Sequence, residues 1–209
     1  MKAKNKSIIF FGVLIILLVI GIIIIFINNK SDRLILLNKK LKKASDFTFS
    51  IKGQNTDFKY ELKILKNDAN YCIEMYNDND HTSTLSKDGY LYYIIHNEQE
   101  YYVLNNEGET DINILENAFS QIENSKYNKG KEEIQGKTYY YEEYEDITEF
   151  LMNPNVQENE KIKTRFYFEG NKIKYIKNIV GTDTEILNVG CEFTSNKDNF
   201  TIPSNYAEK

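Results

Sequence analysis

Residues 46–75 read DFTFSIKGQNTDFKYELKILKNDANYCIEM, and their apolar side chains recur at every second position. The alternation runs through three segments, with Phe47, Phe49 and Ile51, then Phe58, Tyr60, Leu62 and Ile64, then Tyr71, Ile73 and Met75. Period two is typical of a β-strand with one buried face. The polar stretches GQNTD and KNDAN between the segments are rich in turn-forming residues. The stretch therefore predicts three consecutive strands of an antiparallel sheet.

The same alternation continues to the end of the chain. Further strand patterns cover 81–86, 90–96, 100–105, 126–135, 136–146, 163–170, 171–180 and 184–195, with hairpin turns at 135–136 and 170–171. Two helical patterns interrupt them, at 111–124 and 147–152. Hairpin turns between successive strands favour a meander, in which neighbours in sequence are neighbours in the sheet. We expect about eleven strands in one domain.

Residues 8–27 are twenty apolar or glycine residues without one charge. At a rise of about 1.5 Å per residue, a helix of this length spans the roughly 30 Å hydrocarbon core of a bilayer. It is longer than the apolar core of a cleavable signal, about 7–15 residues, and no small-residue cleavage site follows it. The segment predicts a signal anchor, a single transmembrane helix that is retained in the cell membrane.

The anchor divides the chain into four parts. We predict a cytoplasmic tail (1–7), the transmembrane anchor (8–27), a basic juxtamembrane helix (28–45) and an extracytoplasmic β-rich domain (46–209). The juxtamembrane helix rests on the spacing of Leu34, Leu37 and Leu41, at i, i+3 and i+7. Three lysines precede the anchor and six Lys or Arg follow it, so a simple count under the positive-inside rule would place the domain in the cytoplasm. Long domains, however, are translocated largely regardless of charge, and the lysine-bearing tail resembles the start of a secretory signal.

Charge is distributed unevenly along the chain. Residues 1–43 carry nine Lys or Arg and one acidic residue, a net charge of +8. The remainder carries 17 basic residues (26 less 9) and 30 acidic residues (31 less 1), a net charge of −13. Such an acidic domain, without a basic stripe, excludes nucleic acid as a partner. The basic segment either contacts anionic lipid headgroups or is simply solvated.

Signatures of enzymes and metal sites are absent from the sequence. His81 and His96 stand apart from the cysteines, so they lack the spacing of a zinc site, and we expect both to be exposed. Cys72 and Cys191 fall in distant strands, which favours free, buried thiols. Residues 77–89 lack the glycine and glutamate of a calcium loop, and no nucleophile or phosphate-binding motif occurs. The sequence predicts no catalytic residue, no metal and no cofactor.

The most unusual stretch is GKTYYYEEYED, residues 136–146. As a strand, it places Tyr139 and Tyr141 on one face and Tyr140 and Tyr144 on the other. Its carboxylates at i and i+2 lie about 7 Å apart, a separation that suits glycosidases. Such pairs usually come from different strands of a cleft, so an ordinary two-faced strand is the preferred interpretation.

Tyrosine and phenylalanine are abundant, with 16 and 12 copies. Aromatic side chains on both faces of the predicted strands favour a curved sheet around a groove, although a plain core with high β-propensity is the alternative. The residues that we predict to line such a groove are Phe49, Tyr60, Leu62, Tyr71, Ile73, Tyr92, Ile94, Tyr102, Tyr139, Tyr141, Phe166, Phe168 and Tyr175.

The order of elements resembles that of the outer-membrane lipoprotein carrier (LolA-like) superfamily. The resemblance covers about residues 34–206 and rests on KEEIQGKTYYYEEYED (131–146), RFYFEGNKIKYIK (165–177) and the F-x-I-P-x-x-Y pattern of 200–206. It implies an unclosed barrel with helices that lid a hydrophobic cavity. The expected fold class is therefore α+β, mainly β: a transmembrane helix followed by a curved antiparallel half-barrel of about eleven strands with a few lidding helices.

Two functions remain open from the sequence. One is a membrane-tethered, extracytoplasmic binding protein of a bacterial envelope, whose aromatic groove holds a lipid, a lipidated peptide or a lipoprotein. The other is an envelope sensor or protein-interaction module without a small-molecule ligand. A shuttling carrier has to be soluble, so the predicted anchor argues against transport of cargo across an aqueous gap.

Overall fold

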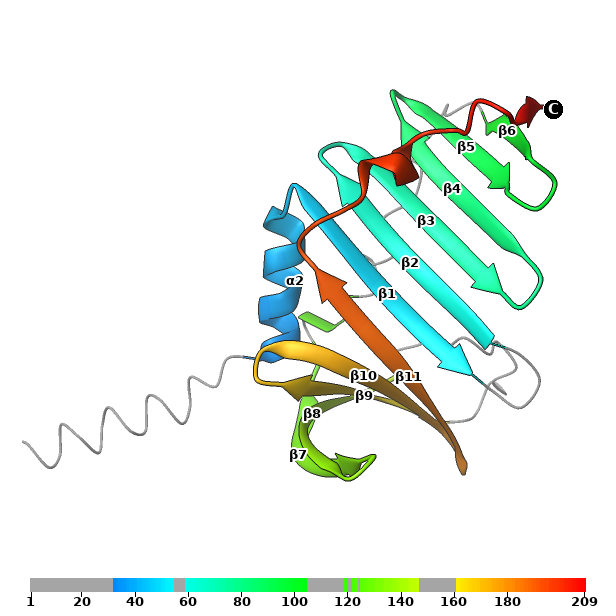
Figure 1. Ribbon diagram of the computed structural model, residues 1–209. Helices are drawn as coiled ribbons and strands as arrows, with labels where there is room; N and C mark the ends of the chain where they lie inside the picture. The colour runs from blue at the N-terminus through cyan, green and yellow to red at the C-terminus, as the bar shows by residue number, and fades with distance from the viewer. Residues whose placement is uncertain (1–31, 55–58, 105–118, 120–121, 124, 147–160) are drawn as a thin grey trace, which may run out of the picture. The chain divides into compact units, whose positions relative to one another are not determined.

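The structure, a computed structural model, describes residues 32–54, 59–104, 119, 122–123, 125–146 and 161–209. Residues Leu34–Lys209 form one compact unit. It contains an α-helix, α2 (Arg33–Lys43), a short 3-10 helix, η1 (Lys197–Phe200), and twelve strands. The strands are β1 (Asp46–Gln54), β2 (Lys59–Asn67), β3 (Asn70–Asn77), β4 (His81–Lys87), β5 (Tyr90–Ile95), β6 (Glu100–Leu104), β7 (Tyr127–Ile134), β8 (Lys137–Glu145), β9 (Ile162–Glu169), β10 (Lys172–Val180), β11 (Asp183–Glu192) and β12 (Ala207–Glu208) (Figure 1).

All twelve strands belong to one sheet, in the order β12-β6-β5-β4-β3-β2-β1-β11-β10-β9-β8-β7. Two antiparallel meanders, β1 to β6 and β7 to β11, are joined where β1 pairs with β11. The predicted turn at Gln135 and Gly136 is confirmed, and both residues have positive φ, 51° and 78°. This is the type I′ geometry that matches the twist of a hairpin, and glycine adopts it without steric cost.

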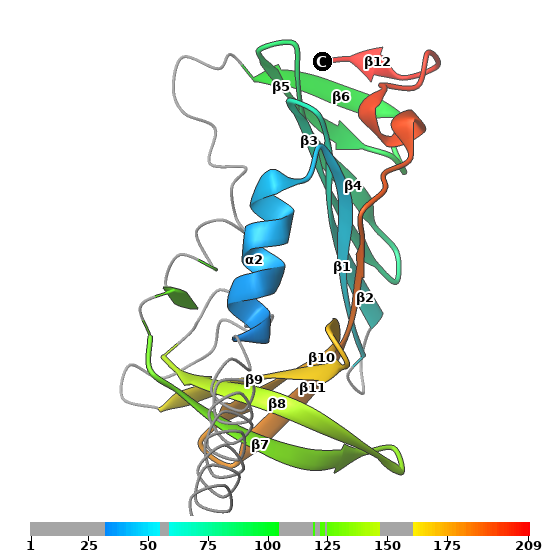
Figure 2. The same cartoon turned by 90° about the vertical axis from the view of Figure 1, so that its left-hand side faces the viewer.

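One face of the sheet, here the inner face, packs against α2 (Figure 2). The helix presents three leucines, spaced as the sequence predicts, to apolar side chains from both meanders. The buried members of this main core are Leu34, Leu37, Leu41, Phe47, Phe49, Ile51, Ile64, Ile73, Phe119, Ile122, Tyr144, Phe166, Phe168, Ile173, Ile176, Leu187 and Val189. Because the helix fills the centre of the inner face, α2 is part of the folded unit.

A buried carboxylate from the sheet meets the first turn of α2. The Leu34 backbone N–H donates to Glu142 Oε2 at 3.2 Å, and the Tyr144 hydroxyl donates to the same oxygen at 3.3 Å. The first N–H groups of a helix have no partner within the helix, and negative charge is favourable there. Glu142 is fully buried, so this contact sets the direction in which the helix enters the core.

The opposite face, here the outer face, carries two smaller apolar clusters. One consists of Leu65, Cys72, Leu85 and Ile94, covered by Phe200 and by the chain that leads to Tyr206. The other is formed by Ile134, Tyr139 and Tyr167. Both cysteines are free. Cys191 lies opposite Phe49 and therefore on the inner face, whereas Cys72 lies on the outer face, so the sheet separates the two thiols.

The predicted fold class, α+β with a half-barrel of about eleven strands and a few lidding helices, is wrong. The structure is mostly β, an open sheet of twelve strands, with α2 as the one α-helix whose bounds the described ranges give; Phe119, Ile122 and Glu123 are helical as well. The sheet stays open because β12 and β7 stand at opposite ends of the strand order. Strand β12 escaped prediction because two exposed residues carry no periodic pattern, and it pairs with β6 in parallel.

Several predicted segments lie outside the described residues. They include the anchor at 8–27, the helix at 147–152 and most of the helix at 111–124, of which Phe119 and Ile122 are described and buried. Among the helices that the structure does describe, none has the length and apolar character needed to span a bilayer. The transmembrane anchor therefore stays a prediction from the sequence.

The packing of α2 can be tested by truncating two leucines that lie two positions apart. Leu34→Ala removes a fully buried side chain from the main core, and we expect a loss of about 2–5 kcal/mol in the free energy of unfolding. Leu36 is 38% exposed, so Leu36→Ala should change it by less than about 0.5 kcal/mol. Urea unfolding of the full chain in detergent, followed by near-ultraviolet circular dichroism, measures both. Equal losses would show that α2 does not dock as described.

Candidate functional site

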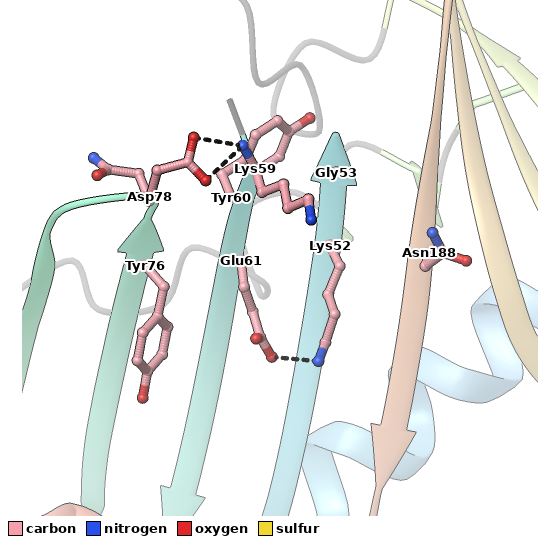
Figure 3. A pocket seen from close by; sticks show the side chains of 9 residues that line it. Lys52, Gly53, Lys59, Tyr60, Glu61, Tyr76, Asp78 and Asn188 are labelled. Atoms are coloured by element: carbon pink, nitrogen blue, oxygen red, sulfur yellow. Dashed lines mark hydrogen bonds and ion pairs between the residues drawn. The ribbon is translucent and has the colours of Figure 1, made fainter. Parts of the chain in front are cut away.

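A continuous row of polar and aromatic side chains crosses the outer face. Residues directly opposite each other in paired strands point to the same face, so the register defines the row. We call it the outer-face row, and its members, from β3 to β8, are Tyr76, Glu61, Lys52, Asn188, Tyr175, Tyr167 and Tyr141. Figure 3 shows its first four members side by side on neighbouring strands.

An open groove lies at the β3–β11 end of this row. Its volume is about 390 Å³, and it is lined by Lys52, Gly53, Lys59, Tyr60, Glu61, Tyr76, Asn77, Asp78 and Asn188 (Figure 3). Four of the nine lining residues are ionisable Lys, Asp or Glu, and none is aliphatic apart from glycine. The composition differs from the mainly apolar lining of a typical lipid or drug pocket.

The groove contains two lysines and two carboxylates, so its formal charge is zero, but only one of the lysines forms an ion pair with a described residue. Lys52 forms an ion pair with Glu61 at 3.1 Å, and the Lys59 backbone N–H donates to both carboxylate oxygens of Asp78 at 3.3 Å (Figure 3). The Lys59 ammonium forms no ion pair with any residue that the structure describes. The groove is therefore lined by this cation from β2 and by the Asn188 amide from β11, a combination that suits a polar ligand with an acidic group.

The other half of the outer face carries an ion cluster made of Glu132, Glu143, Arg165 and Lys177. Arg165 Nε donates to Glu143 Oε2 and its Nη1 donates to Glu132 Oε2, each at 2.6 Å. Lys177 Nζ donates to Glu132 Oε1 at 2.7 Å. The guanidinium also stands 4.6 Å from the ring centroid of Tyr141, within the range of a cation–π contact.

Glycine is required beneath this cluster. The Tyr141 ring lies over Gly130 of the edge strand β7, and a Cβ at that position would overlap the ring. The ion cluster and this ring together hold β7 against β8 and β9.

The cluster fixes the charge of its members. Burial alone raises the pKa of Glu132, but donors from Lys177, Tyr167 and Arg165 outweigh burial and hold it at about 2. Burial likewise raises the pKa of Glu143, but the Arg165 guanidinium outweighs burial and keeps this pKa below its usual range. Burial and Glu132 raise the pKa of Tyr167. Since Glu132, Glu143 and Tyr167 each keep one protonation state near neutral pH, the cluster is suited to holding strands together and not to proton transfer.

Arg165→Ala tests the cluster because it leaves Glu143, which is only 6% exposed, without its closest cation. We expect a loss of about 1–3 kcal/mol in the free energy of unfolding, the cost of an unsatisfied buried charge. Lys137→Ala is a matched control on the same pair of strands, β8 and β9, since the Lys137–Glu169 pair is exposed and its loss should have a clearly smaller effect. Urea unfolding at pH 7 compares the two, and a cost for Arg165→Ala no larger than the control's would contradict a structural role.

Both histidines take part in an aromatic stack at the far end of the outer face. The ring of His81 lies between Tyr76, at 4.0 Å, and His96, at 3.7 Å between centroids. His96 contacts the Ser83 hydroxyl at 2.7 Å and the Tyr206 hydroxyl at 3.1 Å. Ser83 is 3% exposed and so does not meet a substrate. The stack fastens the C-terminal segment to the sheet.

The expectation that both histidines are exposed is wrong, since each is half-buried. Burial, the neighbouring His96 and then Lys63 lower the pKa of His81 to about 4. Burial also lowers the pKa of His96, although Glu74 opposes the shift. A histidine whose folded pKa lies below its unfolded value of about 6.5 stabilises the fold above pH 6.5. That stabilisation is lost as the pH falls from about 6.5 towards 4.

The C-terminal segment should therefore loosen in mild acid. Between pH 7 and pH 5 we expect amide hydrogen exchange in residues 197–208, corrected for the intrinsic effect of pH, to quicken several-fold. His81→Phe keeps an aromatic ring in the stack. It breaks no hydrogen bond of His81 Nε2, since this atom has no partner among the described residues. This variant should show a weaker pH dependence, and an unchanged pH response would exclude His81 as the titrating group.

The predicted groove residues do not form one groove. Seven lie in or against the main core of the inner face: Phe49, Tyr60, Leu62, Tyr71, Ile73, Phe166 and Phe168. Tyr92 and Ile94 pack in the outer cluster beneath the C-terminal segment, and Tyr139, Tyr141 and Tyr175 pack around Tyr167. Tyr102 is 37% exposed on β6. Tyr60 is the member that also lines the polar groove, and its hydroxyl donates to Glu185.

Sequence reasoning missed the groove lysines, the ion cluster and the stack. The stack had a usable signal in the sequence. A two-residue turn at Asp88 and Gly89 fixes which residues of the two strands lie opposite each other, and it places His81 opposite His96. The ion cluster had a weak one, since Arg165 is one of only two arginines among 24 lysines. Nothing local indicated Lys52 beside Asn188, because these residues come from strands far apart in the chain.

Comparisons with known proteins add little to this description. No protein-family model matches the chain, and no curated protein matches it. Among solved structures, the crystal structure of an uncharacterized conserved protein from Thermus thermophilus is similar, with a TM-score of 0.49 and 5% sequence identity. The match covers 84% of this chain and 96% of that one. Similarity at this level carries no argument about function, and membership of the LolA-like superfamily stays a prediction.

Proposed function

We propose that this chain is a membrane-tethered, extracytoplasmic binding domain that recognises a polar, acidic segment of another protein of a bacterial cell envelope. The observation that carries the proposal is the polar groove of about 390 Å³, in which the Lys59 ammonium has no ion-pair partner among the described residues. The ligand binds in the groove at the β3–β11 end of the outer-face row and places an acidic group between Lys59 and Asn188. The role is that of a sensor or interaction module without a cofactor.

Membrane tethering is supported by the uncharged apolar stretch 8–27. An extracytoplasmic position is supported by the length of the domain after the apolar stretch, because long domains are translocated largely regardless of charge. The acidic character of residues 44–209 fits a soluble domain outside the membrane and disfavours a nucleic-acid partner.

Packing of the inner face argues against an acyl-chain groove at the centre of the sheet. The leucines of α2, together with Phe119 and Ile122, occupy the space in which a lipid tail would lie. Protein interiors are close-packed, so a chain of methylene groups would have to displace these side chains.

A lipid or lipopeptide ligand remains a second candidate because of one observation. Beyond the reach of α2, the inner face of β3 to β6 exposes apolar side chains: Met75 is 55% exposed, Tyr93 38%, Tyr102 37% and Leu104 46%. Their register places them on the face that carries Ile73. Contiguous exposed apolar surface of this kind often marks an interaction site.

Site-directed photocrosslinking separates the two candidates. A benzophenone amino acid at Asn188, in living bacteria that carry the chain in their membrane, should give a discrete protein adduct. The same amino acid at Glu192, on the same strand and face but outside the groove, is the control and should not. Lys59→Glu should lower the Asn188 adduct about tenfold, as one attractive charge contact becomes repulsive.

The opposite outcome is equally well defined. A photoreactive fatty acid that labels the peptide containing Tyr93 or Tyr102, with no adduct at Asn188, would replace the protein-binding proposal with the lipid-binding one. Equal adducts at Asn188 and Glu192 would show that the groove is not a specific site.

A further inference from the structure

The solvent-facing side of α2 is a basic surface. The helix carries no acidic residue, and Lys39, Lys40 and Lys43 are exposed, next to Leu36, which is 38% exposed. Lys42 is engaged, since it pairs with Glu123 at 3.0 Å. The other three lysines form no ion pair with any part of the chain that the structure describes. We call Lys39, Lys40 and Lys43 the lysine face.

The lysine face lacks ion-pair partners among the described residues, even though the domain contains many Asp and Glu residues. Residues 44–209 have a net charge of −13, yet several of their carboxylates pair elsewhere: Glu61 and Glu74 with Lys63, Glu132 and Glu143 with Arg165. The apolar side of α2 is already used in the core, so its lysines serve no packing role. A basic surface of this kind is complementary to an external anion.

The position of α2 in the chain limits what that anion can be. The apolar stretch ends at Ile27 and the helix begins at Arg33, so five residues separate them. Five residues, even fully extended, reach at most roughly 20 Å between those ends. A linker of this length allows the lysine face to reach the lipid surface, where the field of anionic headgroups extends about one Debye length, roughly 8 Å at physiological salt.

We propose that the lysine face of α2 docks on anionic lipid headgroups of the membrane in which the chain is anchored. The inference rests on the membrane tether of the proposed function and adds an orienting contact to it. An anionic bilayer repels an acidic domain on balance, whereas it attracts the lysine face of α2. Docking through α2 turns the outer face, with its groove, away from the lipid, since α2 packs on the inner face.

Residue-resolved acetylation of the full chain in nanodiscs tests the contact. The acetylation rates of Lys39, Lys40 and Lys43 should fall about fivefold or more when phosphatidylcholine discs are replaced by discs with about one third phosphatidylglycerol, and should recover at high salt. Lys172, an exposed lysine on the β10 hairpin, is the internal control and should not change. Rates that are the same in both lipid compositions would overturn the proposal, because a merely solvated helix is indifferent to headgroup charge.

A matched pair of variants adds a second readout. Energy transfer from a dye at the C-terminus to a headgroup dye should depend on phosphatidylglycerol in the wild type. The triple substitution Lys39→Gln, Lys40→Gln and Lys43→Gln should abolish that dependence. Replacement of three other exposed lysines, Lys131, Lys161 and Lys172, by Gln should preserve it. If the two triple variants show the same dependence of energy transfer on phosphatidylglycerol, the docking contact is overturned as well.

Failure of this inference and failure of the proposed function give different results. If docking fails but the Asn188 adduct forms, the domain is tethered and binds its partner without a fixed orientation. If the chain is washed from membranes by alkaline carbonate, the tether itself is absent and the proposed function fails with it.

Discussion

The pairing of β1 with β11 joins two halves of the chain that would otherwise be separate meanders. Thr48 lies opposite Glu192, 144 residues further along (192 less 48), and the register continues to Lys52 opposite Asn188. Closing a loop of this length has an entropic cost that grows only slowly with length, so apolar contacts across the junction can offset it. Phe49 and Ile51 on β1, with Val189 on β11, supply those contacts and meet the leucines of α2.

The two faces of the sheet have different physical roles. The inner face is apolar, packs against α2, Phe119 and Ile122, and holds most of the buried apolar residues among those described. The outer face is crossed by charged and phenolic side chains, which mostly satisfy one another, as the Glu132–Arg165 pair and the Tyr76–His81–His96 stack illustrate. The groove lies where that mutual satisfaction is incomplete among the described residues, at Lys59. We therefore assign the proposed binding function to the polar face.

Helix stripes, turns and strand faces could be predicted from the sequence, because each depends on residues that are close together in the chain. Leu34, Leu37 and Leu41 lie on one helical stripe, and the sequence shows it directly. The turn at Gln135 and Gly136 was equally visible, because positive φ at both positions favours a glycine. The division of GKTYYYEEYED into two faces follows from period two. The structure places Tyr140 and Tyr144 at the main core and Tyr139 and Tyr141 on the outer face.

By itself, the sequence determined the strand and turn pattern, the amphipathic helix, the acidic domain and the apolar stretch at 8–27, because each depends on residues that are close together in the chain. The tertiary structure alone decided which aromatic side chains are core, that the sheet stays open, and that Lys52, Lys59 and Asn188 share a groove. These outcomes depend on the pairing of β1 with β11. No local pattern encodes it, since a strand's period specifies its faces but not its partner.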